Sequence, residues 1–236
     1  MGNEILMNDI QNTNQACEIL LNRPQGYFES KRSRFLALAV PVYSEAEALA
    51  VLEARRKEYY DARHHCYAYT IGSKGELFRA ADDGEPAGTG GKPIGEALIA
   101  SGLSHTLVVV TRYFGGTLLG AGPLARAYFA AAQDCLKQAE TARLYFGNRW
   151  QIVFPYTDLA RVERLVEQQA IPRGEAEYGA DVTWQLFLTA EQEEAFLAGL
   201  SEASLGRALG ERGEALSFLV QKGRAIPFDG SPEKQM

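Results

Sequence analysis

Short, dense apolar runs in the first half of the chain predict three strands, at 34–42, 64–71 and 105–113. The last run is so continuously apolar that it is typical of a strand buried on both faces. Ser44 followed by Glu47 is a capping pattern that predicts a helix over 45–58. Its apolar side is expected to hold Ala46, Leu49, Ala50 and Leu52.

Prolines mark the starts of two further helices in this half. Pro93 suits the first turn of a helix running to about Ser101, and Pro123 suits one running to about Ala139. Residues 72–91 carry glycines and acids with little periodicity, and predict a hairpin tip followed by a long loop.

Beyond about residue 144 the pattern changes to strand, helix, strand, strand, helix, strand, which is the ferredoxin-like order. These elements are predicted at 150–155, 158–169, 175–178, 181–189, 191–201 and 215–221. The chain is therefore predicted to be α+β with a boundary near 140–148. Its parts would be a flexible leader (1–24), a first domain (25–143), a ferredoxin-like domain (144–222) and a flexible tail (223–236).

The charge balance argues against a protein that wraps nucleic acid with its whole surface. There are 24 basic and 30 acidic residues, for a net charge of −6 and a pI near 5.3. Residues 1–143 hold 15 basic and 16 acidic side chains, whereas residues 144–236 hold 9 and 14. A polyanion would therefore have to meet a local patch on the first domain.

The cysteines and the apolar runs predict a cytoplasmic protein. Cys17, Cys66 and Cys135 are an odd, sparse set that argues against a disulfide framework. The first 25 residues lack the pattern of a secretory signal, and no apolar run is long enough to span a membrane. We expect no membrane contact.

Arg63-His64-His65-Cys66 looks like a metal cluster, but strand neighbours point to opposite faces, so only His64 and Cys66 share one. No second pair stands at zinc spacing, and we expect neither a metal nor a cofactor. One face would pack in the core, while His65 and the two tyrosines that follow it form another surface. A nucleophilic Cys66 would need an exposed, stabilised thiolate, which an apolar strand does not suggest.

Residues 82–93 read DDGEPAGTGGKP, which invites comparison with a phosphate loop. The comparison fails, because prolines stand where that loop needs its first glycine and its metal-binding hydroxyl. Two interpretations remain: backbone N–H groups with Lys92 hold an anion, or the turn folds onto its own domain with Asp82 and Asp83 capping backbone amides. These two acids with Glu85 could also ligate magnesium.

Arg112-Tyr113-Phe114 follows the most apolar strand and leads into a glycine-rich connection. The glycines resemble the start of a dinucleotide fingerprint, but the spacing and a proline are wrong for it. Arg112 either pairs with an acid such as Asp82 or Asp83 or contacts a ligand. Tyr113 and Phe114 could stack on bases, although core packing is the commoner use of such rings.

Three strings, DARHHCYAY, DDGEPAGTGGKP and VVVTRYFGGTLLGAGPLARAY, closely resemble the bacterial YigZ and eukaryotic IMPACT family over roughly residues 24–220. The resemblance implies a first domain with a βαβ module like that of a ribosomal protein and of the fourth domain of elongation factor G. It implies a second domain like the ferredoxin-like fifth domain of that factor. Pro123 stands where the family would have glycine, which questions close backbone approach there.

Eukaryotic members of the family regulate translation by competing for an activator of a starvation-responsive kinase, through an extra N-terminal domain. Residues 1–24 are expected to be too short to supply it, so that role is not carried over. The resemblance to an elongation factor points to RNA or the ribosome, as a fold-level analogy.

The first hypothesis is a non-enzymatic, translation-associated protein that binds RNA or a ribosomal surface through the first domain. A clustered basic patch there would support it. The predicted ligand- or RNA-binding residues are Arg63, His64, His65, Asp82, Asp83, Glu85, Thr89, Lys92, Arg112, Tyr113, Gly115, Gly116 and Arg126.

Two alternatives stay open. An enzyme or sensor would hold a small phosphorylated ligand at the same loops, with Asp82, Asp83 or Glu85 as base or metal ligand. A pocket joining the loops would favour it. A protein-interaction module would instead use the acidic second domain, and an exposed apolar patch on its sheet would be the sign.

Overall fold

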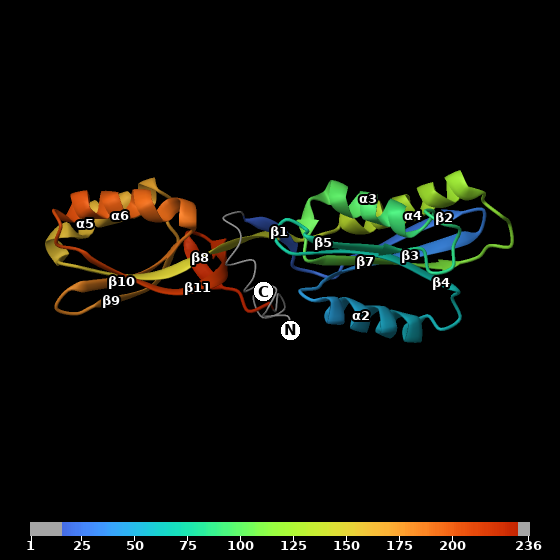
Figure 1. The fold of residues 1–236 in the computed structure, drawn as a ribbon, viewed down its shortest axis with the longest axis horizontal. Coiled ribbons are helices and arrows are strands. Elements are labelled where there is room, and N and C mark those ends of the chain that lie inside the picture. The colour runs from blue at the N-terminus through green and yellow to red at the C-terminus, as the bar shows by residue number, and fades with distance from the viewer. Residues whose placement is uncertain (1–15, 231–236) are drawn as a thin grey trace. The chain divides into compact units, whose positions relative to one another are not determined.

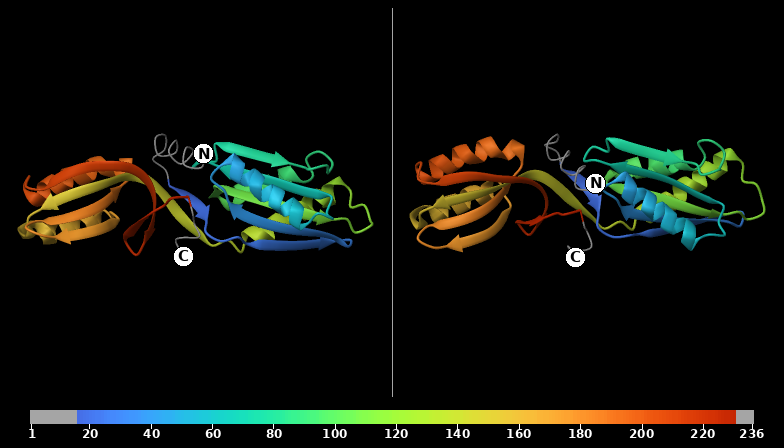
Figure 2. Two further views of the ribbon diagram at one scale, coloured as in Figure 1. Left: turned by 90° about the horizontal axis from the view of Figure 1, so that it is seen from below. Right: turned by 60° about the horizontal axis from the view of Figure 1, so that its bottom comes forward.

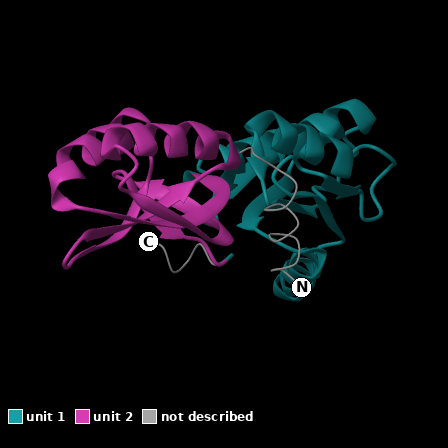
Figure 3. Cartoon of the chain, turned by 60° about the vertical axis from the view of Figure 1, so that its left-hand side comes forward, with its two compact units in different colours: residues 1–6, 17–142, 230–236 teal, residues 7–16, 143–229 magenta. Residues whose placement is uncertain are grey.

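The computed structural model describes residues 16–230 of an α+β chain that divides into two compact units (Figure 3). Unit 1 holds residues 17–142 with Gly230, and unit 2 holds Ala16 with residues 143–229. No helix within residues 16–230 is long and apolar enough to cross a membrane.

A five-stranded antiparallel sheet forms the centre of unit 1 (Figure 1). Its strand order is β2-β3-β7-β4-β5. The strands are β2 (Gln25–Ser30), β3 (Ser33–Pro41), β4 (His64–Ile71), β5 (Leu77–Ala81) and β7 (Thr106–Tyr113). Strands β2 and β5 were not predicted, and β5 lies within the expected loop 72–91.

Helices cover both faces of this sheet (Figure 1; Figure 2). Helices α3 (Gly91–Ser101) and α4 (Ala121–Leu136) pack on one face, which includes Val108 and Val110. Helix α2 (Glu45–Glu58) packs on the other face, against Leu107 and Val109. The central strand β7 is therefore buried on both faces, as its continuous apolar run predicts.

The expected apolar side of α2 is right for Leu52 and wrong for its other three residues. Ala48, Leu52 and Arg55 are buried, whereas Ala46, Leu49 and Ala50 are exposed. Ser44 caps the helix by accepting a hydrogen bond from Glu47 N, as expected. The buried side of the helix is formed by residues 48, 52 and 55, which are spaced i, i+4 and i+7.

The surface expected for His65 and its tyrosines is also wrong. Helix α2 covers this face, so Tyr69 packs in a second core layer with Leu52, and His65 is buried too. Tyr67 is half-buried against the same layer.

Segments near both ends of the chain are more ordered than the predicted leader and tail. Strand β1 (Cys17–Leu20) pairs in parallel with β6 (Leu103–Ser104). Strand β12 (Arg224–Pro227) pairs with β11 (Leu209–Gln221), and Phe228 is buried. The rest of the expected leader and tail, 1–15 and 231–236, lies outside the described residues.

Unit 2 follows the element order β-α-β-β-α-β. These elements are β8 (Thr141–Phe154), α5 (Leu159–Gln168), β9 (Arg173–Tyr178), β10 (Val182–Leu188), α6 (Ala190–Ser204) and β11, with a short 3-10 turn η1 (Tyr156–Asp158) before α5. Strand β8 pairs with both β10 and β11, and β10 pairs with β9. Ile152, Trp184 and Leu186 face α5 and α6 in one apolar core. The predicted boundary, 140–148, is thus occupied by a continuous strand.

Strand β1 supplies a test of whether residues 17–20 belong to the folded unit. Ile19 is fully buried, so Ile19→Ala should lower the free energy of unfolding by about 3 kcal/mol, through lost burial and a residual cavity. Glu18→Ala changes the exposed neighbour on the same strand and should alter it by less than about 0.5 kcal/mol. Denaturant unfolding of both variants measures this, and equal midpoints would show that β1 adds no stability.

Candidate functional site

The residues of the three family-like strings meet at one cavity of unit 1, of about 690 Å³. Its lining comes from residues 61–64, 85–86, 112–114 and 118–121, with Leu124 of α4. We call it the motif cavity.

Sheet register explains why these distant segments meet. His64, at the start of β4, lies directly opposite Arg112, near the end of β7. Strand β5 runs back along β4, with Ala81 opposite Tyr67, so the loop that follows it returns beside the start of β4. The cavity therefore lies at the end of the sheet where β4 begins and β7 ends.

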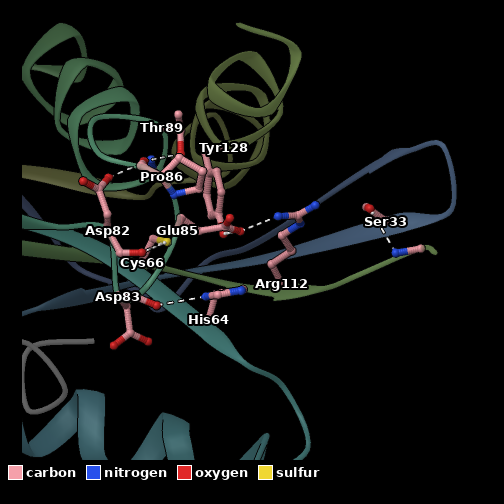
Figure 4. A network of polar contacts seen from close by, with 12 residues as sticks. Ser33, His64, Cys66, Asp82, Asp83, Glu85, Pro86, Thr89, Arg112 and Tyr128 are labelled. Atoms are coloured by element: carbon pink, nitrogen blue, oxygen red, sulfur yellow. Dashed lines mark hydrogen bonds and ion pairs between the residues drawn. The ribbon is translucent and has the colours of Figure 1, made fainter. Parts of the chain in front are cut away.

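A buried ion pair joins the loop to β7 (Figure 4). Arg112 Nη1 donates to Glu85 Oε1 at 2.5 Å, and the two side chains are 7% and 4% exposed. Tyr128 of α4 donates its hydroxyl to the same oxygen at 2.8 Å. Burial raises the pKa of Tyr128, so this hydroxyl keeps its proton and remains a donor. Arg112 thus pairs with Glu85, not with Asp82 or Asp83.

The carboxylate of Asp82 accepts hydrogen bonds from the backbone amides of the glycine-rich loop. It accepts from the N–H groups of Gly88, Gly90 and Gly91 at 2.8, 2.9 and 2.8 Å. Burial alone would raise the pKa of Asp82, but these three bonds outweigh it and lower the pKa below its ordinary value. The expectation that these amides hold an external anion is therefore wrong, and the self-capped turn is what forms. Lys92 is exposed and does not line the cavity.

Asp83 has a separate set of partners. Its carboxylate accepts from His65 N at 2.7 Å and pairs with Arg56 at 2.9 Å. Its backbone carbonyl lies 2.9 Å from His64 Nδ1. Because Asp82, Asp83 and Glu85 each have different partners, they do not form the suggested magnesium site. Within residues 16–230 no three His, Cys, Asp or Glu side chains gather as metal ligands.

Several predicted site residues lie away from the cavity. His65 is buried on the α2 side, where Nδ1 lies 3.1 Å from Thr111 Oγ1 and burial lowers the pKa of the ring. Thr89 is buried and donates to Pro86 O at 2.6 Å. Arg126 is exposed on α4 and does not line the cavity. Of the predicted set, the cavity collects Arg63, His64, Glu85, Arg112 and Tyr113.

The motif glycines serve close backbone packing. A Cβ on Gly91 would lie 2.6 Å from Ala81 N, and one on Gly115 would lie 2.2 Å from Arg32 C. Gly116 has φ +82°, a conformation that side chains rarely adopt. Pro123, the departure from the family pattern, is exposed in the first turn of α4 and does not line the cavity.

Some residues of the site carry little sequence signal. Tyr128 resembles the other inward residues of α4, and only the structure shows its hydroxyl on Glu85. Asp61 accepts from the Tyr113 hydroxyl at 2.6 Å, which raises the pKa of Tyr113 to about 12. Phe114, by contrast, is already a candidate stacking residue from the sequence; it lines the cavity and is 54% exposed.

Two family models match the chain: the Impact N-terminal domain at residues 31–136, and a domain of unknown function, DUF1949, at residues 152–207. An IMPACT family member from Thermus thermophilus is 41% identical over 178 residues, which cover 75% of this chain and 96% of that protein. The IMPACT family member YigZ of Escherichia coli K12 is 36% identical, over 75% of this chain and 88% of YigZ. A crystal structure described as that of a hypothetical protein is 33% identical with a TM-score of 0.56, and the match covers 85% of this chain and 98% of that one.

The Asp82 carboxylate should stabilise the loop strongly. Asp82→Ala removes a charged acceptor from three N–H groups and should lower the free energy of unfolding by about 3 kcal/mol. Because the folded-state pKa is depressed, this contribution is full above about pH 5 and is lost as the pH falls through the folded pKa. Urea unfolding at several pH values measures the difference between wild type and variant.

Lys92→Ala is the matched control, since it changes an exposed residue just after the loop. It should leave stability within about 0.5 kcal/mol at every pH. If the difference in unfolding free energy between wild type and Asp82→Ala stayed constant down to pH 2, this would contradict the role given to the carboxylate charge of Asp82.

Proposed function

The chain belongs to the IMPACT family, and from that premise we propose that it is a translation-associated protein that binds RNA at the motif cavity of unit 1. The observation that carries the proposal is that one cavity, which all three strings line, holds both an exposed cation, Arg63, and an exposed ring, Phe114. Arginine pairs with phosphate, and an exposed ring stacks on a base.

Three further basic residues belong to a segment, 31–34, that contacts the end of β7 and the glycine that follows it. Arg34 is exposed and its guanidinium lies 4.8 Å from the centre of the Tyr113 ring. The backbone of Lys31 and Arg32 packs against Gly115, and both side chains are exposed. These residues support a local basic patch on a chain whose net charge is −6.

The second candidate is an enzyme or sensor for a small ligand. The size of the cavity, about 690 Å³, favours it, because such volumes are typical of small-molecule sites. Its phosphate would have to meet Arg63, since Asp82 occupies the loop amides and Lys92 lies outside the cavity. The protein-interaction alternative has less support. The face of the unit 2 sheet turned away from α5 and α6 carries the polar Gln151, Gln185 and Glu177, although Leu209, opposite Val153, is exposed there.

We also propose fold relationships for the two units. The strand order β11-β8-β10-β9 with two crossing helices supports a ferredoxin-like unit 2. The resemblance of unit 1 to the fourth domain of elongation factor G stays an analogy that makes a ribosomal surface one natural source of the RNA. We propose that the units correspond to separate domains with the boundary in β8, and that the protein works in the cytoplasm.

The proposal predicts salt-sensitive binding of single-stranded RNA. Arg63→Ala should weaken binding and reduce the slope of log affinity against log salt by about 0.7, as expected for one lost phosphate contact. Phe114→Ala should weaken binding roughly tenfold with the slope unchanged, because a stacked base is lost. Fluorescence anisotropy with a short labelled oligonucleotide across a salt series measures both.

Lys92→Ala is the matched control, because it removes an exposed cation of the same loop region that does not line the cavity. It should bind nearly as wild type. No binding of RNA by the wild-type protein at low salt, or equal losses for Lys92→Ala and Arg63→Ala, would overturn the proposed function.

A further inference from the structure

Arg112 has hydrogen-bonding capacity that the protein leaves unused. Its Nη1 donates to Glu85, but its buried Nε–H meets no acceptor within residues 16–230. A buried donor without an acceptor destabilises the site in which it lies. Because Arg112 lines the motif cavity, a ligand carbonyl could satisfy the guanidinium.

Glu85 has unused capacity of the opposite kind. Its Oε1 accepts from Arg112 and from Tyr128, whereas no described group donates to Oε2. The side chain is 4% exposed and lines the same cavity. Oε2 is therefore the carboxylate oxygen left to accept from a ligand N–H in the cavity.

His64 adds a second acceptor. The backbone carbonyl of Asp83 can only accept, so the contact at 2.9 Å places the proton of the neutral ring on Nδ1. Nε2 then carries a lone pair. His64 lines the cavity beside Glu85 and Arg112.

We infer that the motif cavity binds a guanine base, an inference that rests on the proposed function and names its ligand. The three side chains offer one donor and two acceptors, and guanine presents the complement: the O6 acceptor with the N1–H and N2–H donors. Uracil and cytosine each bring one donor group with two acceptors, and adenine has no carbonyl for Arg112. Phe114, Pro86 and Leu118 supply apolar walls for the ring, and Arg63 supplies a cation for the phosphate.

The test compares uridine heptanucleotides that carry one central guanosine, adenosine or inosine. Guanosine should bind about tenfold more tightly than adenosine, with inosine between them because it lacks only the 2-amino group. Glu85→Gln should bring the guanosine-to-adenosine ratio close to one, while Arg63→Ala should weaken all three and leave the ratio unchanged. In the second arm, ligand-observed NMR measures the binding of free guanosine monophosphate and of free adenosine monophosphate.

The outcomes separate this inference from the proposed function. Binding of all three oligonucleotides with equal affinity would overturn the guanine site and leave RNA binding intact. Binding of guanosine monophosphate but of no oligonucleotide would support the guanine site and overturn RNA as its source. Binding of neither would overturn both. The wild-type comparisons do not depend on whether Glu85→Gln folds, and thermal unfolding of that variant checks it.

Discussion

The buried ion pair between Glu85 and Arg112 is the interaction on which the candidate site depends. It ties the loop after β5 to the end of β7, and the hydroxyl of Tyr128 adds α4 to the same carboxylate. Both charges are shielded from water, so loss of either partner would leave the other uncompensated, which is strongly destabilising. These bonds join the second and third strings, and the bonds of His64 and His65 to Asp83 add the first, so the three strings are parts of one structure.

The sequence of the glycine-rich loop, 82–93, resembles that of a phosphate-binding loop, but the loop has a structural role. Asp82 uses its carboxylate on amides that a phosphate would otherwise need, and Gly91 is small because Ala81 lies directly against it. The loop is held from within and supports Glu85. In the proposed function, contact with RNA therefore falls to side chains at the cavity, above all Arg63 and Phe114.

Local features of the fold were predictable because they depend on neighbouring residues. The Ser44 cap, the burial of β7 on both faces and the shared face of His64 and Cys66 follow from spacing alone. Contacts between distant segments were not predictable, because sheet register decides that His64 lies opposite Arg112.

The candidate site was predictable only in part for the same reason. The strings identified Arg63, His64, Glu85, Arg112 and Tyr113 as candidates, and all five line the cavity. Charge and residue type could not separate them from Lys92, Arg126 and His65, which lie elsewhere. The amphipathic pattern of α4 predicts only that Tyr128 is a core residue. Its role depends on the hydrogen bond from its hydroxyl to Glu85, which that pattern does not predict.

Photo-crosslinking tests the central claim, that RNA is bound at the motif cavity, most directly. An oligonucleotide carrying 6-thioguanosine would be irradiated with the full chain, and the crosslinked peptides identified by mass spectrometry. The account predicts crosslinks to the peptide that contains Phe114, reduced in Phe114→Ala and unchanged in Lys92→Ala. Crosslinks confined to unit 2, or to α3 around Lys92, would contradict it.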